Sequence, residues 1–73
     1  MAIKNRLEDI RLQMGFRFQK EFAAFLGMNY SHYNRIANNT MQPEYEVMLD
    51  ICDRIRIRIP DIRVEDLFYK VAD

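Results

Sequence analysis

Side chains that can read nucleotide bases gather on one side of a predicted helix over residues 30–38. With about 100° of rotation per residue, this side carries five polar residues, the reading strip: Tyr30 at its edge, Ser31, Asn34, Arg35 and Asn38. The opposite side is apolar, through Tyr33, Ile36 and Ala37. Arginine pairs with guanine through two hydrogen bonds, asparagine pairs with adenine, and serine pairs with either kind of partner. The strip therefore predicts contact with base edges, although a polar face can also serve solubility alone.

A second short helix over residues 19–26 would position the reading strip. Gly27 joins the two helices, and a glycine permits the left-handed backbone that reverses the chain. Ala23, four residues earlier, is small enough for the next helix to cross close above it. Asn29 occupies the position of an N-terminal cap, where its side chain accepts a bond from an early helical amide. Together these features predict a helix-turn-helix at about 19–38.

The remaining apolar spacing predicts three more helices around this pair. One covers residues 2–14 and ends at Gly15, one runs from Pro43 to about Arg56 or Arg58, and a short last one contains Val64, Leu67, Phe68 and Val71. Residues 54–59 alternate Arg and Ile with period two, which fits a strand as well as a helix; we prefer a helix running out into an extended connector that Pro60 closes. The expected fold is all-α, with residues 1–73 as one domain.

The charge distribution is uneven although the formal net charge is zero. Residues 1–43 contain six Lys and Arg against three acids, and residues 44–73 contain five against eight. A basic N-terminal part would attract phosphates, but uneven solvated faces also arise by chance. The chain has no long apolar run, no signal-type N-terminus and one cysteine, so we expect a reduced, cytoplasmic protein without membrane contact.

No arrangement of residues in the sequence predicts catalysis, a cofactor or a metal. The acid pairs 8–9 and 65–66 are adjacent, so their members point to different sides of a helix. His32 has no second histidine beside it and is expected to pack or to touch a phosphate. Cys52 lies on the inward side of its helix and is expected to be buried. An enzyme is therefore not expected.

Nearly the whole chain resembles the Cro/repressor helix-turn-helix family, often called XRE-like. The segments that carry the resemblance are IKNRLEDIRLQMG, QKEFAAFLGMNYSHYNRIANN, QPEYEVMLDICDRI and VEDLFY, and its most specific part is the spacing of Gln19, Ala23, Gly27, Tyr33, Ile36 and Asn38. The resemblance implies a bundle of five helices like that of lambda repressor, binding of a palindromic double-stranded DNA operator as a homodimer, and repression of transcription.

The resemblance also assigns roles to individual residues. Base reading falls to Tyr30, Ser31, Asn34 and Arg35. Phosphate contact falls to Gln19, with Arg17, Asn29 and the loop of Asn38, Asn39 and Thr40, whose backbone amides would clamp the phosphate. The dimer contact falls to the C-terminal helix and its flanks, at Ile57, Ile59, Leu67, Phe68 and Val71.

The sequence departs from the family pattern at four places. One extra residue separates Gly15 from Gln19, Tyr33 replaces a branched aliphatic residue, and the segment 56–61 is longer than usual. Ala37 replaces a glutamate that would pair with Arg11, which is then expected to face solvent or phosphate. Two alternatives remain open: an antitoxin that represses its own operon and binds a small protein partner, and a helical protein-interaction module without DNA binding.

Overall fold

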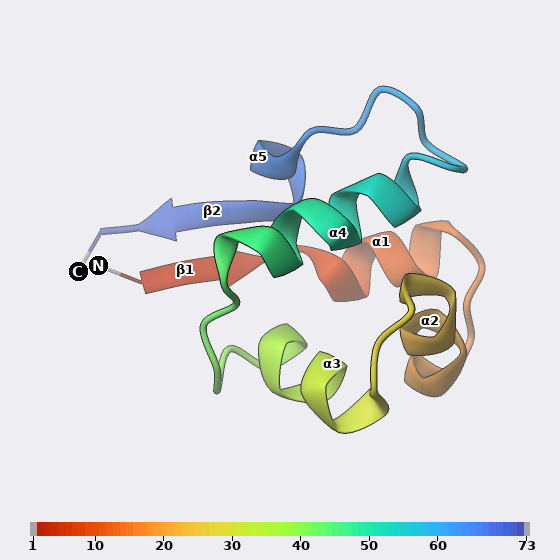
Figure 1. The fold of residues 1–73 in the computed structure, drawn as a ribbon, viewed down its shortest axis with the longest axis horizontal. Coiled ribbons are helices and arrows are strands. Elements are labelled where there is room, and N and C mark those ends of the chain that lie inside the picture. Colours follow the sequence, from red (N-terminus) through yellow and green to blue (C-terminus); the bar gives the residue numbers. More distant parts are fainter. Residues whose placement is uncertain (1, 73) are drawn as a thin grey trace.

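A computed structural model of the protein describes residues 2–72, which form five helices and one two-stranded sheet. The elements follow the order β1 (Ala2–Asn5), α1 (Leu7–Gln13), α2 (Gln19–Leu26), α3 (Tyr30–Ala37), α4 (Tyr45–Ile55), α5 (Val64–Leu67) and β2 (Phe68–Val71). In Figure 1, α4 crosses the middle of the molecule, α3 lies below it, and the sheet extends to the left, where β1 begins and β2 ends. The fold is thus mixed α/β, and the expected all-α fold is wrong.

The two strands come from the two ends of the chain. β1 and β2 pair antiparallel, with Ala2 opposite Val71 and Asn5 opposite Phe68; we call this pair the terminal sheet. The sequence predicted helix at both places, because Ile3 and Val71 continue the helical spacing of their neighbours. The pairing is non-local: each strand is stabilised by hydrogen bonds to the opposite end of the chain, which local periodicity does not reveal.

The outer edge of β1 is covered by a side chain. The backbone N–H of Ile3 donates to Oε1 of Gln42 at 3.1 Å, and Nε2 of Gln42 donates to the carbonyl of Ile3 at 3.2 Å. The primary amide of Gln42 thus takes the place of a neighbouring strand on that edge. At the other end of β1, the N–H of Arg6 donates to the carbonyl of Leu67 at 2.8 Å, which leads the chain from the sheet into α1.

The helix-turn-helix forms at the predicted residues. Gly27 ends α2 with φ 73°, a left-handed conformation, and its N–H donates to the carbonyl of Ala24. Asn29 caps α3 as expected: its side chain accepts from the N–H of Ser31 at 2.8 Å and of His32 at 3.4 Å. Helix α1 begins at Leu7, five residues later than expected, and stops shortly before Gly15, which has φ 83°.

After α4 the chain turns and does not extend. The N–H groups of Ile57 and Arg58 donate to the carbonyls of Arg54 and Ile55, and Ile59 also donates to Ile55. The alternation of Arg and Ile therefore belongs to a helix end followed by turns, and neither a strand nor an extended connector forms. Ile55 is buried, whereas Ile57 is 68% exposed.

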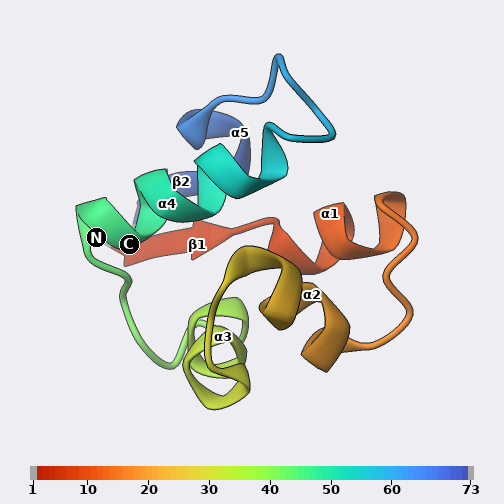
Figure 2. The same ribbon diagram turned by 45° about the vertical axis from the view of Figure 1, so that its right-hand side comes forward.

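The core lies between α4, the helix-turn-helix and the terminal sheet (Figure 2). Its largest fully buried side chains are Tyr33, Phe22, Leu7, Ile36, Ile51, Ile55, Leu67 and Cys52. The ring of Phe22 meets the ring of Tyr33 edge to face, with 5.5 Å between the centroids. Among residues 2–72, no helix has the length and apolar character needed to cross a membrane.

Candidate nucleic-acid interface

The reading strip lies on the outer side of α3, which forms one edge of the molecule in both ribbon views (Figures 1 and 2). Ser31, Arg35 and Asn38 are exposed, Tyr30 is 41% exposed and Asn34 is half-buried. The opposite side of α3 is buried through Tyr33, Ile36 and Ala37. The predicted separation of α3 into a polar and an apolar side is therefore confirmed. The polar side chains lie together, and the other side of the helix is buried in the core.

Gln19 connects the first turn of α2 to the reading strip. Its Nε2 donates to Oε1 of Glu8 at 2.8 Å. Its Oε1 accepts from Nδ2 of Asn34 at 3.1 Å and from the hydroxyl of Tyr30 at 3.3 Å. The side chain of Gln19, predicted to bind phosphate, thus holds two residues of the reading strip, Tyr30 and Asn34, by hydrogen bonds.

Glu8 lies at the centre of the hydrogen bonds behind α3. Its Oε2 accepts from the hydroxyl of Tyr33 at 2.6 Å, and its two oxygens accept from Nη2 and Nε of Arg11, both at 3.2 Å. With Gln19 and Asn34, these residues form what we call the polar network. The expectation that Arg11 faces solvent or phosphate is wrong, because an acid on its own helix, three residues earlier, pairs with it. The hydroxyl of Tyr33 finds its partner in the same carboxylate.

Two pKa values are shifted within the polar network. Burial alone would raise the pKa of Glu8, but the hydrogen bonds from Tyr33, Gln19 and Arg11 outweigh it, so the pKa lies below its usual value. Burial, together with the carboxylate of Glu8, raises the pKa of Tyr33 well above its usual range. At neutral pH the carboxyl is therefore ionised and the phenol protonated, which is the combination that makes the 2.6 Å hydrogen bond strong.

A basic pocket adjoins the reading strip at the start of α2. It has a volume of about 490 Å³ and is lined by Arg11, Arg17, Phe18, Gln19, Lys20 and Tyr30. Arg11 holds the connector before α2, since its Nη1 donates to the carbonyls of Phe16 and Arg17 at 2.9 and 2.8 Å. Lys20 brings its Nζ to 5.7 Å from the ring centroid of Tyr30. Lys20 was not among the predicted phosphate-contacting residues, although it directly follows Gln19 in the sequence.

The loop after α3 uses its backbone amides internally. The N–H groups of Asn38, Asn39 and Thr40 donate to the carbonyls of Asn34, Ile36 and Arg35 at 3.0, 3.0 and 2.9 Å. Asn39 adopts φ 62°, the left-handed conformation that asparagine tolerates. The three residues are exposed, but their backbone amides are already bonded within the chain and do not form the expected phosphate clamp.

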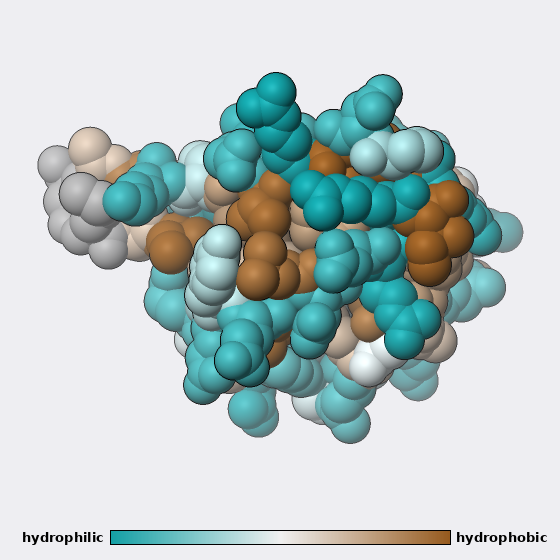
Figure 3. Space-filling view, turned by 45° about the horizontal axis from the view of Figure 1, so that its top comes forward, coloured by the Kyte–Doolittle hydropathy of each residue, from teal (hydrophilic) through white to brown (hydrophobic). Residues whose placement is uncertain are grey.

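Residues expected at the dimer contact lie in different environments. Leu67 and Phe68 are 0% and 6% exposed and belong to the core of the single chain, so they present no surface to a partner. Ile59 and Val71 are half-buried, and Ile57 is exposed. Figure 3 views the side with α4, α5 and the loop between them, where hydrophobic patches are separated by hydrophilic residues. The predicted contact surface is therefore reduced to Ile57 and the exposed parts of Ile59 and Val71.

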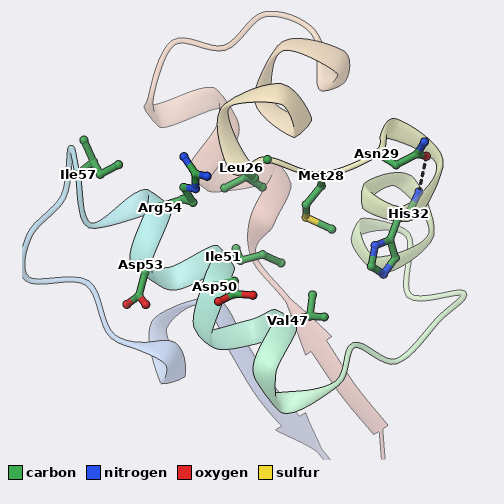
Figure 4. Close-up of a pocket in the computed structure, with 11 residues that line it drawn as sticks. Leu26, Met28, Asn29, His32, Val47, Asp50, Ile51, Asp53, Arg54 and Ile57 are labelled. Carbon is green, nitrogen blue, oxygen red and sulfur yellow. Dashed lines mark hydrogen bonds between the residues drawn. The ribbon is translucent and has the colours of Figure 1, made fainter.

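A separate groove of about 670 Å³ runs between the helix-turn-helix and α4 (Figure 4). Apolar side chains including Met28, Val47 and Ile51 line it together with the charged Asp50, Asp53 and Arg54. His32 is half-buried and lines the α3 side of this groove; its expected role in packing or phosphate contact stays a prediction.

The remaining candidates for special chemistry have structural roles. Cys52 is fully buried, its Sγ lies 3.8 Å from the carbonyl of Ile62, and burial raises the pKa of the thiol, so it is not poised to react. Within residues 2–72, no group of three or more His, Cys, Asp or Glu side chains could hold a metal ion.

Comparison of the chain with protein-family models, with curated proteins and with solved structures gave no match. By its fold and its site, the protein is therefore a small α/β domain that presents a polar helix beside a basic pocket.

Proposed function

We propose that this protein binds DNA in a sequence-specific way and regulates transcription, as a homodimeric repressor in the cytoplasm. The observation that carries the proposal is the reading strip on α3. It combines exposed hydrogen-bonding side chains with a buried opposite side, which is the arrangement a helix needs to enter the major groove and stay in register.

The surroundings of α3 support this function. The first turn of α3 contains no acid, so no negative side chain there repels a phosphate that approaches the positive end of the helix dipole. Arg17 and Lys20 line the basic pocket beside Tyr30. In this arrangement Arg35, Asn34, Ser31 and Tyr30 read bases, while Arg17, Lys20 and the side chains of the 38–40 loop contact phosphates and set the register.

Selection of bound fragments from a random pool of double-stranded DNA tests the proposal. We expect a palindromic motif with half-site centres about 34 Å apart, since two copies of α3 would enter successive major grooves. The affinity should fall steeply with salt, because phosphate contacts release counterions. Recovery of no preferred sequence, with no salt-dependent affinity, would refute it.

The groove beside α4 supports a second function, a helical module that binds a protein. Its mixture of apolar and charged lining residues suits a peptide or helix of another protein. This alternative predicts that the chain shows no salt-dependent affinity for DNA, and that charge reversal at Asp50 or Asp53 abolishes the interaction with the partner. Measurement of DNA affinity at several salt concentrations therefore separates the two functions.

A further inference from the structure

We propose that Glu8, on α1, sets the direction in which the side-chain amide of Asn34 faces DNA. Glu8 would then be a positioning residue for base recognition although it does not lie on the reading strip. The inference rests on the proposed function, because it assigns Glu8 a part in reading DNA.

The first step concerns the orientation of Gln19. An ionised carboxylate only accepts hydrogen bonds. Because Oε1 of Glu8 lies 2.8 Å from the amide of Gln19, that amide must turn its Nε2 toward Glu8 and its Oε1 toward α3. Arg11 and Tyr33 occupy the remaining acceptor sites of the carboxylate, so the carboxylate itself is held in one position.

The second step passes this orientation to α3. An amide oxygen also only accepts, so Asn34 must turn its Nδ2 toward Oε1 of Gln19, at 3.1 Å. Oδ1 of Asn34 then points the other way and accepts from Nδ2 of Asn38 at 3.1 Å. Three amides in series, on Gln19, Asn34 and Asn38, therefore take one direction, and the negative charge of Glu8 determines it.

The third step connects the direction of the amide to base recognition. In the major groove adenine presents an acceptor, N7, next to a donor, N6. An asparagine amide matches this pair in one order only, and a reversed amide presents the opposite order. Asn34 keeps a second hydrogen on Nδ2 and a second lone pair on Oδ1 for this contact. Fixing the amide before binding favours one base and reduces the ordering that binding requires.

The variant Glu8→Gln tests the inference. Glutamine has nearly the same shape, but one end of its amide donates, so Gln19 and Asn34 can be satisfied in either direction. Asp9→Asn is the matched control, because it removes the same charge from the next residue of α1, which is exposed. A third variant, Asn34→Ala, identifies the base pair that Asn34 reads as the position where preference disappears.

Each variant is carried through the selection from random DNA beside the natural sequence. For Glu8→Gln we expect the preference at the base pair of Asn34 to fall about tenfold, with preferences elsewhere retained. Asp9→Asn should keep every preference. If Glu8→Gln retains the preference at that base pair, or weakens all positions equally, the positioning role is overturned while the DNA-binding function stands. If the natural sequence selects no motif, the proposed function is overturned first and this inference with it.

If Glu8→Gln does not fold, a fourth variant keeps the test decisive. Gln19→Met removes the amide that connects Glu8 to Asn34 and leaves Arg11 and Tyr33 on the carboxylate. The preference at the base pair of Asn34 should relax by a similar factor. In the free protein, nuclear magnetic resonance should show the side-chain amide signals of Asn34 and Asn38 shifted in Gln19→Met and in Glu8→Gln, but not in Asp9→Asn. Unchanged amide signals in both variants would show that Glu8 does not set the orientation of the Asn34 and Asn38 amides.

Discussion

The polar network and the terminal sheet attach α1 to the rest of the molecule in different ways. The network joins side-chain atoms, and Glu8 alone receives hydrogen bonds from three residues. The terminal sheet joins backbone atoms, and the fully buried Leu67 directly precedes its second strand. Backbone pairing and apolar packing do not depend on ionisation, whereas the network depends on one charge. We therefore expect the terminal sheet to contribute most to the stability of the fold, and the polar network to contribute less to stability while fixing the orientation of the reading strip.

The largest expected effect comes from breaking the sheet side. Leu67→Ala should lower the free energy of unfolding by about 2–5 kcal/mol, because it leaves a cavity next to β2. Urea denaturation followed by circular dichroism measures the loss. The matched control is Leu12→Ala on α1, where the side chain is 63% exposed, and its effect should stay within about 0.5 kcal/mol.

The same experiment tests the location of Leu67. If Leu67 belonged to a dimer contact, raising the protein concentration would restore the stability of the variant. We expect no such recovery, since Leu67 is buried within the single chain. A loss of stability that depended on protein concentration would place Leu67 in a subunit interface. It would also weaken the contrast between the terminal sheet and the polar network.

A smaller effect should follow from removing one hydroxyl from the network side. Tyr33→Phe keeps the buried ring but removes the donor at 2.6 Å from Glu8, which should lower the free energy of unfolding by about 1.5–3 kcal/mol. The pKa of Glu8 should rise toward its usual value, because one of the hydrogen bonds that lower it is lost. Tyr45→Phe, at a tyrosine that is 66% exposed, serves as the control and should change neither quantity.

Two substitutions, one on the reading strip and one in the basic pocket, test the proposed DNA contacts and separate base preference from phosphate attraction. Arg35→Ala should weaken DNA binding by about 1–3 kcal/mol and relax the preference at one base pair. Lys20→Ala, in the basic pocket, should weaken all sequences alike and reduce the salt dependence by about one phosphate contact. Footprinting and titration at several salt concentrations measure both. If Arg35→Ala leaves affinity and preference unchanged, its base-reading role is wrong.

Local signals in the sequence predicted the helix-turn-helix well. Gly27 ends a helix through its own backbone freedom, Asn29 caps the next helix two residues later, and the apolar positions of α3 follow helical spacing. Each of these residues acts on neighbours that lie within about one helical turn of it in the sequence. Sequence pattern alone is therefore sufficient to define both helices and the polar side of α3.

The terminal sheet and the polar network depend on contacts that a single sequence does not display. Ile3 pairs with Lys70 across the length of the chain, and its spacing to Leu7 and Ile10 fits a helix equally well. Glu8 pairs with Arg11 on its own helix, but only the packed structure brings it within reach of Tyr33, 25 residues away. Its spacing of three from Arg11 was the one available signal, because residues three apart on a helix are neighbours.

The smallest expected effect is a pH dependence that belongs to the network side alone. The pKa of Glu8 in the folded protein lies below its value of 4.5 in the unfolded chain, so the unfolded state binds more protons in acid. The stability from this group is fully present above pH 4.5 and is lost as the pH falls through the folded pKa. Urea denaturation at a series of acid pH values should show a shallower slope for Glu8→Gln than for the natural sequence. Asp9→Asn should keep the steeper slope; equal slopes in the natural sequence and Glu8→Gln would show that the network does not depend on the charge of Glu8.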